Sequence, residues 1–464
     1  MARFLTSKFV VIGFLVLLFM IGLTMLSSLV RERQQYNEDV IQGIGKDYVN
    51  PQTILAPYIV VPTTLQIVCK EDIAKKCLID YNILLTPQNS AWNHQLQVSN
   101  TNFKRGIYKA ITYVDNLSVK GKFSLPEQLI TPEQNQTIHW EKAKLRLSIS
   151  DLRGLTNQPI LTLGGQKLTF DFPTGDSSNP LGMTYTEVPL VLSAQNPHFD
   201  FSLDFSLNGM SSLAIIPVGK DMSMTMDANW AHPSFYGASL PQKKIQSNQF
   251  SASWQNTYIS NQNAEHLNTC LNANDNTACE ALKNAENSAF SVKLIEAVDN
   301  YTLSDRSIKY AMLFLLITFG TFFLFEVLKK LPIHPMQYTL VAAALGVFYL
   351  LLLSFSEHVG FALAYLGSSI ACVFLISYYV YYVLKGIGRT LLLTAILSLM
   401  YGSMYLILQT EEMTMILGAL LVFTLIAATM FLTRHIDWYD INASNSTSNS
   451  ASKIKSPSPA NLEN

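Results

Sequence analysis

A run of apolar residues near the start of the chain most constrains its fold, because no ionisable group occurs from Phe9 to Val30. As an α-helix, which rises about 1.5 Å per residue, this run reaches about 33 Å and covers a hydrocarbon core about 30 Å thick. The basic leader of Arg3 and Lys8 is also typical of a secretory signal peptide. However, the run exceeds the usual signal length of about 7–15 apolar residues, and no Ala-x-Ala-like cleavage site follows. We therefore interpret it as an uncleaved signal anchor.

A second apolar region breaks into five segments of spanning length, separated by short polar connections such as "SEH" and "QTEE". Short connections make neighbouring helices antiparallel. Only 14% of the residues are charged, against about 25% in a soluble domain. The sequence thus predicts six membrane-spanning helices in all, with the lipid bilayer as a partner. The five later segments are Tyr310–Leu328, Met336–Phe355, Val359–Val380, Thr390–Leu408 and Met413–Thr433.

The orientation follows from the short loops, because lysine and arginine are retained on their cytoplasmic side. Lys329 with Lys330 and Lys385 with Arg389 mark two loops on one side of the membrane. The alternate loops, "SEH" and "QTEE", contain neither residue type. This pattern predicts that both termini are cytoplasmic and that residues 31–306 are translocated.

The translocated region alternates apolar and polar residues. "FDFSLDFSL" at 199–207 places its phenylalanines and leucines on one face, and "MSMTMDANW" at 222–230 and "KLRLSIS" at 144–150 repeat the pattern. Strict period two is typical of half-buried antiparallel strands, and turn signals such as "LGGQ" separate them. We expect a large antiparallel β-sandwich-like domain, in one or two lobes.

These features divide the chain into five parts, and an Asn-rich insert inside the β-rich part is expected to be a loop with a short helix. The last part is rich in serine, asparagine and proline, which is typical of disorder. The parts are 1–30 (leader and first transmembrane helix), 31–50 (helical stalk), 51–303 (β-rich domain), 304–439 (five-helix transmembrane bundle) and 440–464 (cytoplasmic tail).

Four cysteines lie in the translocated region as two close pairs, Cys69 with Cys77 and Cys270 with Cys279, while Cys372 lies in a span. An oxidising compartment favours a disulfide within each pair. Free thiols and a zinc site are the alternatives, although no Cys-x-x-Cys spacing or nearby histidine supports zinc. We expect two local disulfides.

No catalytic or cofactor motif is evident. The eight histidines show no His-x-x-x-His or His-Glu-x-x-His spacing, and the sequence lacks a Gly-x-Ser-x-Gly elbow and a phosphate-binding loop. The net charge of −1 argues against nucleic acid as a partner. We therefore expect no enzyme activity, cofactor or metal.

Ionisable residues at the middle of a span would indicate transport, because a carboxylate at mid-membrane is costly and usually functional. No span carries a charge at its middle. Glu326 lies one turn from the inner end, and we expect an interfacial ion pair with Lys329 and Lys330. Glu357 and His358 lie in an outer turn, where a solvated turn is favoured over a pH sensor.

The stretch "NWAHPSFYGASLP", 229–241, concentrates polar and aromatic side chains between two expected strands. Its prolines and glycine favour a folded corner, a partner-binding surface is the next alternative, and a catalytic loop centred on His232 and Ser234 is the least favoured. The residues singled out as a candidate partner-binding or signature loop are Asn229, Trp230, His232, Pro233, Phe235 and Gly237.

Several stretches resemble the CreD family, inner-membrane proteins of Gram-negative bacteria. They include "APYIVVP" (56–62), "RGIY" (105–108), the 229–241 stretch, "SDRSIKYAMLFLLITFGTFFLFE" (304–326) and "MFLTRHIDWY" (430–439). The resemblance implies six spans, a periplasmic domain and a link to envelope integrity and stress. It supplies no catalytic residues and does not extend to the cysteine pairs.

The first functional hypothesis is a non-enzymatic inner-membrane protein that supports envelope integrity, with its β-rich domain contacting a periplasmic protein or cell-wall component. The second is a transporter or channel formed by the five-helix bundle. The third is a membrane-tethered hydrolase that uses His232 and Ser234. The sequence does not indicate the ligand or the oligomeric state.

Overall fold

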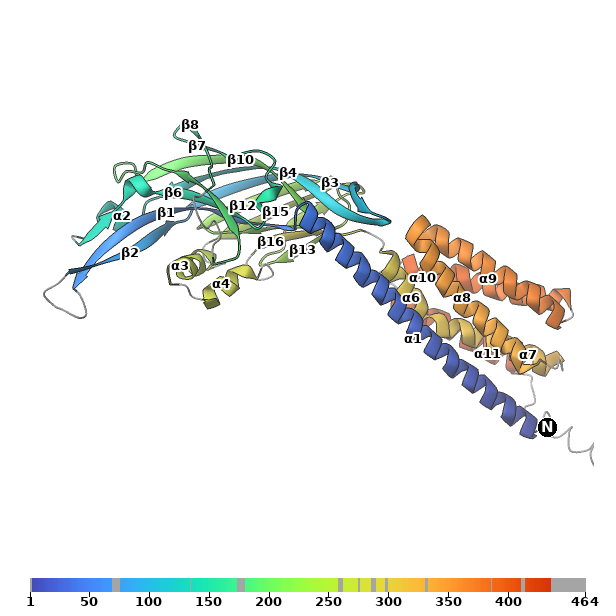
Figure 1. Cartoon of the computed structure of the whole chain (residues 1–464). Helices are drawn as coiled ribbons and strands as arrows, with labels where there is room; N and C mark the ends of the chain where they lie inside the picture. Colours follow the sequence, from blue (N-terminus) through green and yellow to red (C-terminus); the bar gives the residue numbers. More distant parts are fainter. Residues whose placement is uncertain are drawn as a thin grey trace, which may run out of the picture. The chain divides into compact units, whose positions relative to one another are not determined.

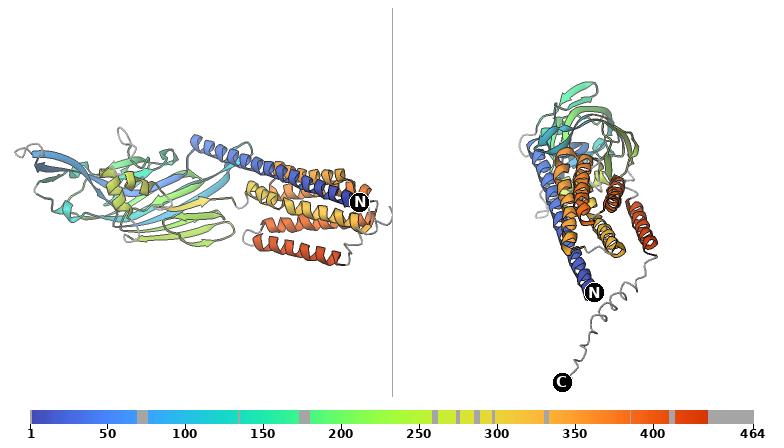
Figure 2. Two further views of the ribbon diagram at one scale, coloured as in Figure 1. Left: turned by 90° about the horizontal axis from the view of Figure 1, so that it is seen from below. Right: turned by 90° about the vertical axis from the view of Figure 1, so that its right-hand side faces the viewer.

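The chain combines apolar helices with a large sheet-built unit. The computed structural model describes residues 2–68, 76–133, 135–172, 180–257, 262–273, 276–284, 289–296, 299–329, 333–384, 386–409 and 414–434. Two compact units emerge: a helical unit of Met1–Tyr36 with Val298–Asn464, and a sheet unit of Asn37–Ala297. Figure 1 labels the elements of both units, and Figure 2 shows them from two further directions.

The helical unit contains a helix at every place where an apolar segment predicts one. By length and composition, four described helices (α1, α8, α9 and α10) can cross a membrane, or five when the bent pair α6–α7 is included. The expected total of six stays a prediction. The helices are α1 (Ala2–Asp47), α6 (Asn300–Lys309), α7 (Ala311–Lys329), α8 (Pro335–Val359), α9 (Phe361–Leu384), α10 (Ile387–Gln409) and α11 (Thr414–Thr433).

The segment before α7 is helical from Asn300, earlier than the bundle boundary at 304 that the sequence suggests. The carboxylate of Asp299 accepts hydrogen bonds from the backbone N–H groups of Tyr301 and Thr302 and so caps α6. A bend of 40° at Tyr310 separates α6 from α7. The bend coincides with the change from the mostly polar α6 to the apolar α7, but such a change of composition does not by itself specify a bend.

The sheet unit contains two sheets of eight strands each. Sheet A has the order β13 (Pro233–Gly237), β16 (Phe290–Leu294), β11 (Ser212–Ile216), β1 (Gln52–Val68), β6 (Lys144–Ile149) and β9 (Thr184–Pro189), with β2 (Lys76–Leu85) and β5 (Gln136–Ile138) also paired to β1. Sheet B has the order β14 (Gln242–Ile245), β15 (Phe250–Thr257), β12 (Asp221–Ala228), β3 (Asn89–Arg105), β4 (Tyr108–Ser124), β10 (His198–Met210), β7 (Ile160–Leu163) and β8 (Gln166–Thr169).

One hydrophobic core joins the two sheets. The alternation read from the sequence is confirmed in β12, where Met222, Met224 and Met226 are buried and the residues between them are exposed. Trp92 and Trp254 are among the largest fully buried side chains of this core. Because burying such a side chain contributes about 1.5–3 kcal/mol or more, the core accounts for much of the unit's stability. Of the expected one or two lobes, the structure has one.

The expectation of a purely antiparallel sandwich is wrong at two pairings. β1 pairs with β11 in parallel, from Gln52 opposite Leu213 onward, and β12 pairs with β3 in parallel, from Asp221 opposite Asn89 onward. Side-chain alternation has the same period of two in parallel and antiparallel strands. Strand direction depends on which distant segments become neighbours, so the pattern could not predict it.

Two helices cover part of the outer face of sheet A. α3 (Asn263–Ala273) and α4 (Asn276–Lys283) occupy the Asn-rich insert, which was expected to hold one short helix. Leu267 of α3 and Leu282 of α4 are fully buried members of the core. Figure 1 shows these two helices beside β1 and β2. This cover explains why residues 54–61 of β1 are buried on both faces.

The last turns of α1 belong to the sheet unit. Ile44 packs with Ala110 and Met210 in a small separate cluster, and the ring of Tyr48 stacks on Phe103 with centroids 4.0 Å apart. Arg153 donates a hydrogen bond of 2.6 Å to the backbone carbonyl of Lys46. The segment expected as a stalk is thus helical to Asp47, where these contacts fasten it to the strands.

Candidate functional site: the 229–241 corner and a polar cavity on sheet A

The 229–241 stretch crosses from sheet B to sheet A and back. Asn229 directly follows β12, and its side-chain oxygen accepts a hydrogen bond of 2.6 Å from the backbone N–H of Val98 on β3. Its side-chain nitrogen donates to the carbonyl of the same residue at 3.2 Å. Val98 lies just beyond the end of the β12–β3 ladder, so its backbone N–H and C=O groups have no strand partner on that side. The side-chain amide of Asn229 satisfies both groups instead.

The aromatic residues of this corner pack inward. The indole nitrogen of Trp230 donates to the carbonyl of Ile295 at 2.9 Å. Phe235, on edge strand β13, makes edge-to-face contacts with Phe250 at 5.5 Å and Trp254 at 5.6 Å. Gly237 has φ of +114°, a conformation that favours glycine. These are the contacts of a folded corner between two sheets.

Among the described residues, the two side chains proposed for catalysis have no side-chain partner. His232 is exposed, and Pro233 follows it as the first residue of β13. Within the described residues, the side chains of His232 and Ser234 form no hydrogen bond or ion pair with another side chain. A hydrolytic site needs a nucleophile hydrogen-bonded to a base, and Ser234 has no such side-chain hydrogen bond among those residues.

The variant Asn229→Ala is expected to lower the free energy of unfolding of the sheet unit by about 1–2 kcal/mol, because two hydrogen bonds to Val98 are lost. Denaturation followed by tryptophan fluorescence measures the change. The exposed variant Asn196→Ala is the matched control and should stay within about 0.5 kcal/mol of wild type. Equal stability of both variants would contradict the assigned role.

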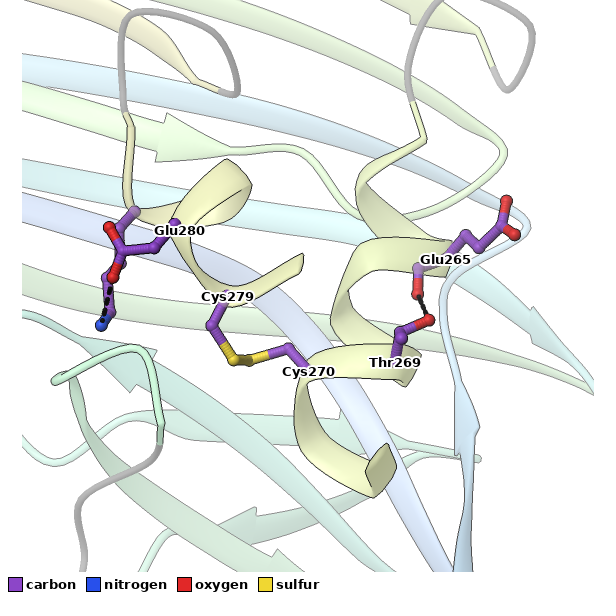
Figure 3. The surroundings of a disulfide bond; sticks show 6 residues. Glu265, Thr269, Cys270, Cys279 and Glu280 are labelled. Carbon is purple, nitrogen blue, oxygen red and sulfur yellow. Dashed lines mark hydrogen bonds and ion pairs between the residues drawn. A yellow bond between two sulfur atoms is a disulfide. The ribbon is translucent and has the colours of Figure 1, made fainter. Parts of the chain in front are cut away.

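The cysteines of the Asn-rich insert form a disulfide that joins α3 to α4. Cys270 and Cys279 lie with their Cα atoms 4.9 Å apart, and both are buried. Figure 3 shows the bond between the two helices. Cys77 is also disulfide-bonded, whereas its expected partner Cys69 lies outside the described residues. Cys372 is a buried free thiol in α9.

A row of polar residues crosses the outer face of sheet A. Tyr58 of β1 lies directly opposite Arg146 of β6, which lies opposite Glu187 of β9. Glu187 is only 7% exposed and accepts from Lys144 Nζ at 2.5 Å and from Arg146 Nε at 3.2 Å. The guanidinium of Arg146 also lies over the ring of Tyr185, 4.3 Å from its centroid. The orientation of the Arg146 guanidinium is therefore held by two side chains of β9.

This row borders a polar cavity of about 150 Å³ between the sheet and α3. Arg146 and Tyr185 form its floor from the sheet, and Asn82 of β2 lies at its side. Leu271 and Asn272 form the wall from α3, and the Asn272 amide donates to the carbonyl of Asn82 at 2.8 Å. The wall residues directly follow Cys270, so the disulfide helps to hold them in place.

Electrostatics connect Tyr58 to the same cluster. Burial raises the pKa of the Tyr58 hydroxyl, while the neighbouring Ser148 hydroxyl and the positive charge of Arg146 act in the opposite direction. The phenol therefore stays protonated near neutral pH. Neither Tyr58 nor Arg146 can be recognised as a site residue from the sequence, because "KLRLSIS" indicates only alternation. The continuous apolar run of β1 is the one sequence feature that indicates a covered outer face of sheet A.

A second buried polar pair lies between the sheets. His94 of β3 and Asp115 of β4 are both fully buried, with Nδ1 and Oδ2 2.6 Å apart. His94 Nε2 and Asp115 Oδ1 have no hydrogen-bond partner within the described residues. The ring of Trp92 stacks near His94 at 5.8 Å.

The polar residues of the helical unit have partners that the sequence did not predict. Glu326 accepts a hydrogen bond of 3.3 Å from the hydroxyl of Tyr338 on α8. Glu326 was expected to pair with Lys329 and Lys330. The side chain of Lys329 and the whole of Lys330 lie outside the described part of the chain. Glu357 accepts a hydrogen bond of 3.1 Å from the hydroxyl of Tyr301 on α6.

Over the described residues, no group of three or more metal-ligating side chains is present.

Comparison with known proteins gives a family for the chain. The family model described as "Inner membrane protein CreD" matches residues 4–439. Inner membrane protein CreD of Escherichia coli strain K12 is 32% identical over 427 residues, which cover 91% of this chain and 91% of that relative. The match therefore includes both the sheet unit and the apolar helices.

Similar solved structures are much more distant. A proposed nutrient binding protein of Legionella pneumophila is 8% identical, with 57% of this chain and 84% of that chain covered and a TM-score of 0.27. An M1 zinc metallopeptidase of Deinococcus radiodurans is 9% identical, with 37% and 38% covered and a TM-score of 0.19. At these TM-scores neither similarity supports a statement about fold or function.

Proposed function

This chain belongs to the CreD family of inner membrane proteins, and on that premise we propose that it supports the integrity of the cell envelope without enzymatic chemistry. Its sheet unit is the part proposed to act, by contacting a periplasmic protein or a cell-wall component. The observation that supports this proposal is a sheet unit with one continuous core, in a chain whose other unit consists of apolar helices.

The proposal places the sheet unit in the periplasm and both termini in the cytoplasm. The distribution of lysine and arginine between the short loops supports this topology. The disulfide between Cys270 and Cys279 agrees with an oxidising compartment.

Topology is tested by single-cysteine labelling. Asp200, with a side chain 82% exposed, becomes a reporter for the sheet unit in the variant Asp200→Cys. We expect this cysteine to react with a membrane-impermeant maleimide in cells whose outer membrane alone has been opened. The variant Ser450→Cys, in the proposed cytoplasmic tail, is expected to react only after lysis. Labelling of Asp200→Cys only after lysis would overturn the topology.

The non-enzymatic part of the proposal is tested separately. We expect the double variant His232→Ala/Ser234→Ala to complement a deletion strain as well as wild type does, because neither side chain is held by a partner within the described residues. Loss of complementation, with normal amounts of folded protein in the membrane, would instead favour the hydrolase hypothesis.

The envelope role itself is tested by deleting the gene and measuring sensitivity to detergent, β-lactam and osmotic stress. We expect increased sensitivity to at least one of these, restored by the wild-type gene. Unchanged growth under all three conditions would contradict the proposal. Transport by the bundle is the alternative function, and solute or ion flux in reconstituted liposomes would favour it over the envelope role.

A further inference from the structure

We propose that the cavity between sheet A and α3 binds an oxyanion, the carboxylate or phosphate group of a small molecule, with Arg146 as its principal donor. This site goes beyond the proposed function, which does not depend on it. The argument rests on the charge around the cavity, the hydrogen-bond donors that line it, its size and the way in which its wall is built.

The charges around the cavity favour an anion. Lys144 and Arg146 face the single carboxylate of Glu187, so two positive charges meet one negative charge. Asp171 pairs through its backbone with Glu187 on the side away from Arg146, and its side chain is exposed to solvent. The carboxylate of Asp171 is therefore solvated, whereas the Arg146 side chain is only 26% exposed. Among the described residues, one excess positive charge remains in a partly desolvated position, where a bound oxyanion would neutralise it.

The donors that remain match an oxyanion. Nε of Arg146 donates to Glu187, whereas its two Nη nitrogens have no carboxylate, carbonyl or amide acceptor in the described part of the sheet unit. A guanidinium presents such nitrogens as a planar fork that fits two oxygens of a carboxylate or phosphate. Stacking on Tyr185 holds the plane of this fork in place. The side-chain amide of Asn82, which has no hydrogen bond among these residues, supplies a further donor at the cavity's side.

The size of the cavity limits the ligand. A volume of about 150 Å³ is comparable to cavities that hold a molecule of about the size of benzene. The site therefore accepts a small anion, or the anionic end of a longer molecule. Val60, Leu84, Pro180 and Leu271 give the cavity an apolar lining beside its polar residues, a combination typical of small-molecule sites.

The test is isothermal titration calorimetry on the full-length protein in detergent micelles, at constant ionic strength set with sodium chloride. Inorganic phosphate and sodium succinate are the two probes, and they distinguish a phosphate from a carboxylate ligand. We expect saturable binding of at least one probe to the wild-type protein. Absence of saturable binding by both probes would overturn the proposal.

Variants then locate the binding. Asn82→Asp places a carboxylate at the side of the cavity, at an exposed position that the fold tolerates, and is expected to weaken binding at least tenfold. Arg146→Gln should abolish binding, with folding checked by tryptophan fluorescence. The control Asn196→Asp makes the same chemical change at an exposed turn that does not line the cavity, and it should bind as wild type does. Wild-type affinity in Asn82→Asp would assign the binding to another place and overturn the proposal.

Discussion

The variant His94→Leu is expected to unfold with a free energy about 3–5 kcal/mol below that of the wild-type sheet unit. His94 and Asp115 are fully buried and 2.6 Å apart. Removing the imidazole leaves the Asp115 carboxyl in an apolar core without its partner, and such a group cannot recover a hydrogen bond from solvent. Chemical denaturation of the full-length protein in detergent, followed by tryptophan fluorescence, measures the loss. Trp92, which stacks near His94, makes the signal sensitive to this part of the core.

Two further variants make that experiment decisive. The double variant His94→Leu/Asp115→Leu removes both polar groups and is expected to recover most of the loss, because apolar residues of similar volume often replace a buried pair at little cost. His232→Leu makes the same change at an exposed position and should stay within about 0.5 kcal/mol of wild type. If His94→Leu were as stable as His232→Leu, the buried pair would have no significant part in the stability of the sandwich.

Loss of the α3–α4 disulfide is the second large expected effect. The double variant Cys270→Ser/Cys279→Ser is expected to destabilise this helical pair by about 2–3 kcal/mol, as estimated for a bond that closes a short loop. The two cysteines are separated by nine positions in the sequence and are buried against the core, so the serine hydroxyls add a further cost of desolvation. Hydrogen–deuterium exchange of residues 262–273 and 276–284 measures the local loss of protection.

The matched control changes the same two helices at their exposed faces. Asn268→Ser/Glu280→Ser introduces the same residue type at solvent-exposed positions and removes only surface interactions, such as the ion pair of Glu280 with Lys283. Such pairs contribute about 0–1 kcal/mol, so exchange should stay close to that of wild type. Equal protection in both double variants would show that packing of Leu267 and Leu282, rather than the disulfide, holds the helices.

The corner at 229–241 illustrates how far residue patterns lead. Its prolines, glycine and aromatic residues predicted a folded connection, and Trp230 and Phe235 do pack inward there. The bond of Asn229 to Val98 could not be predicted, because 131 positions separate the two residues. Only the pairing of β12 with β3 brings them together.

The polar cavity illustrates the opposite case. Arg146, Glu187 and Asn272 lie far apart in the sequence, and each one alone resembles an ordinary surface residue. The register of β6 with β9 places Arg146 opposite Glu187, and the helical insert then covers the face on which they lie. A charged residue in an alternating strand indicates which face it occupies, but not what covers that face.

The sequence by itself determined the apolar helices, the strand character of the intervening region, the inward residues of strands such as β12, and the family. These properties depend on local hydrophobicity and on motifs of consecutive residues, which a single segment carries in full. Only the tertiary structure decided the parallel pairings, the bend at Tyr310, the buried contact of His94 with Asp115 and the cavity beside Arg146. The contacts require segments distant in sequence to meet, and the angle of the bend between α6 and α7 does not follow from their composition. The free energy of such contacts therefore cannot be deduced from any one stretch of the chain.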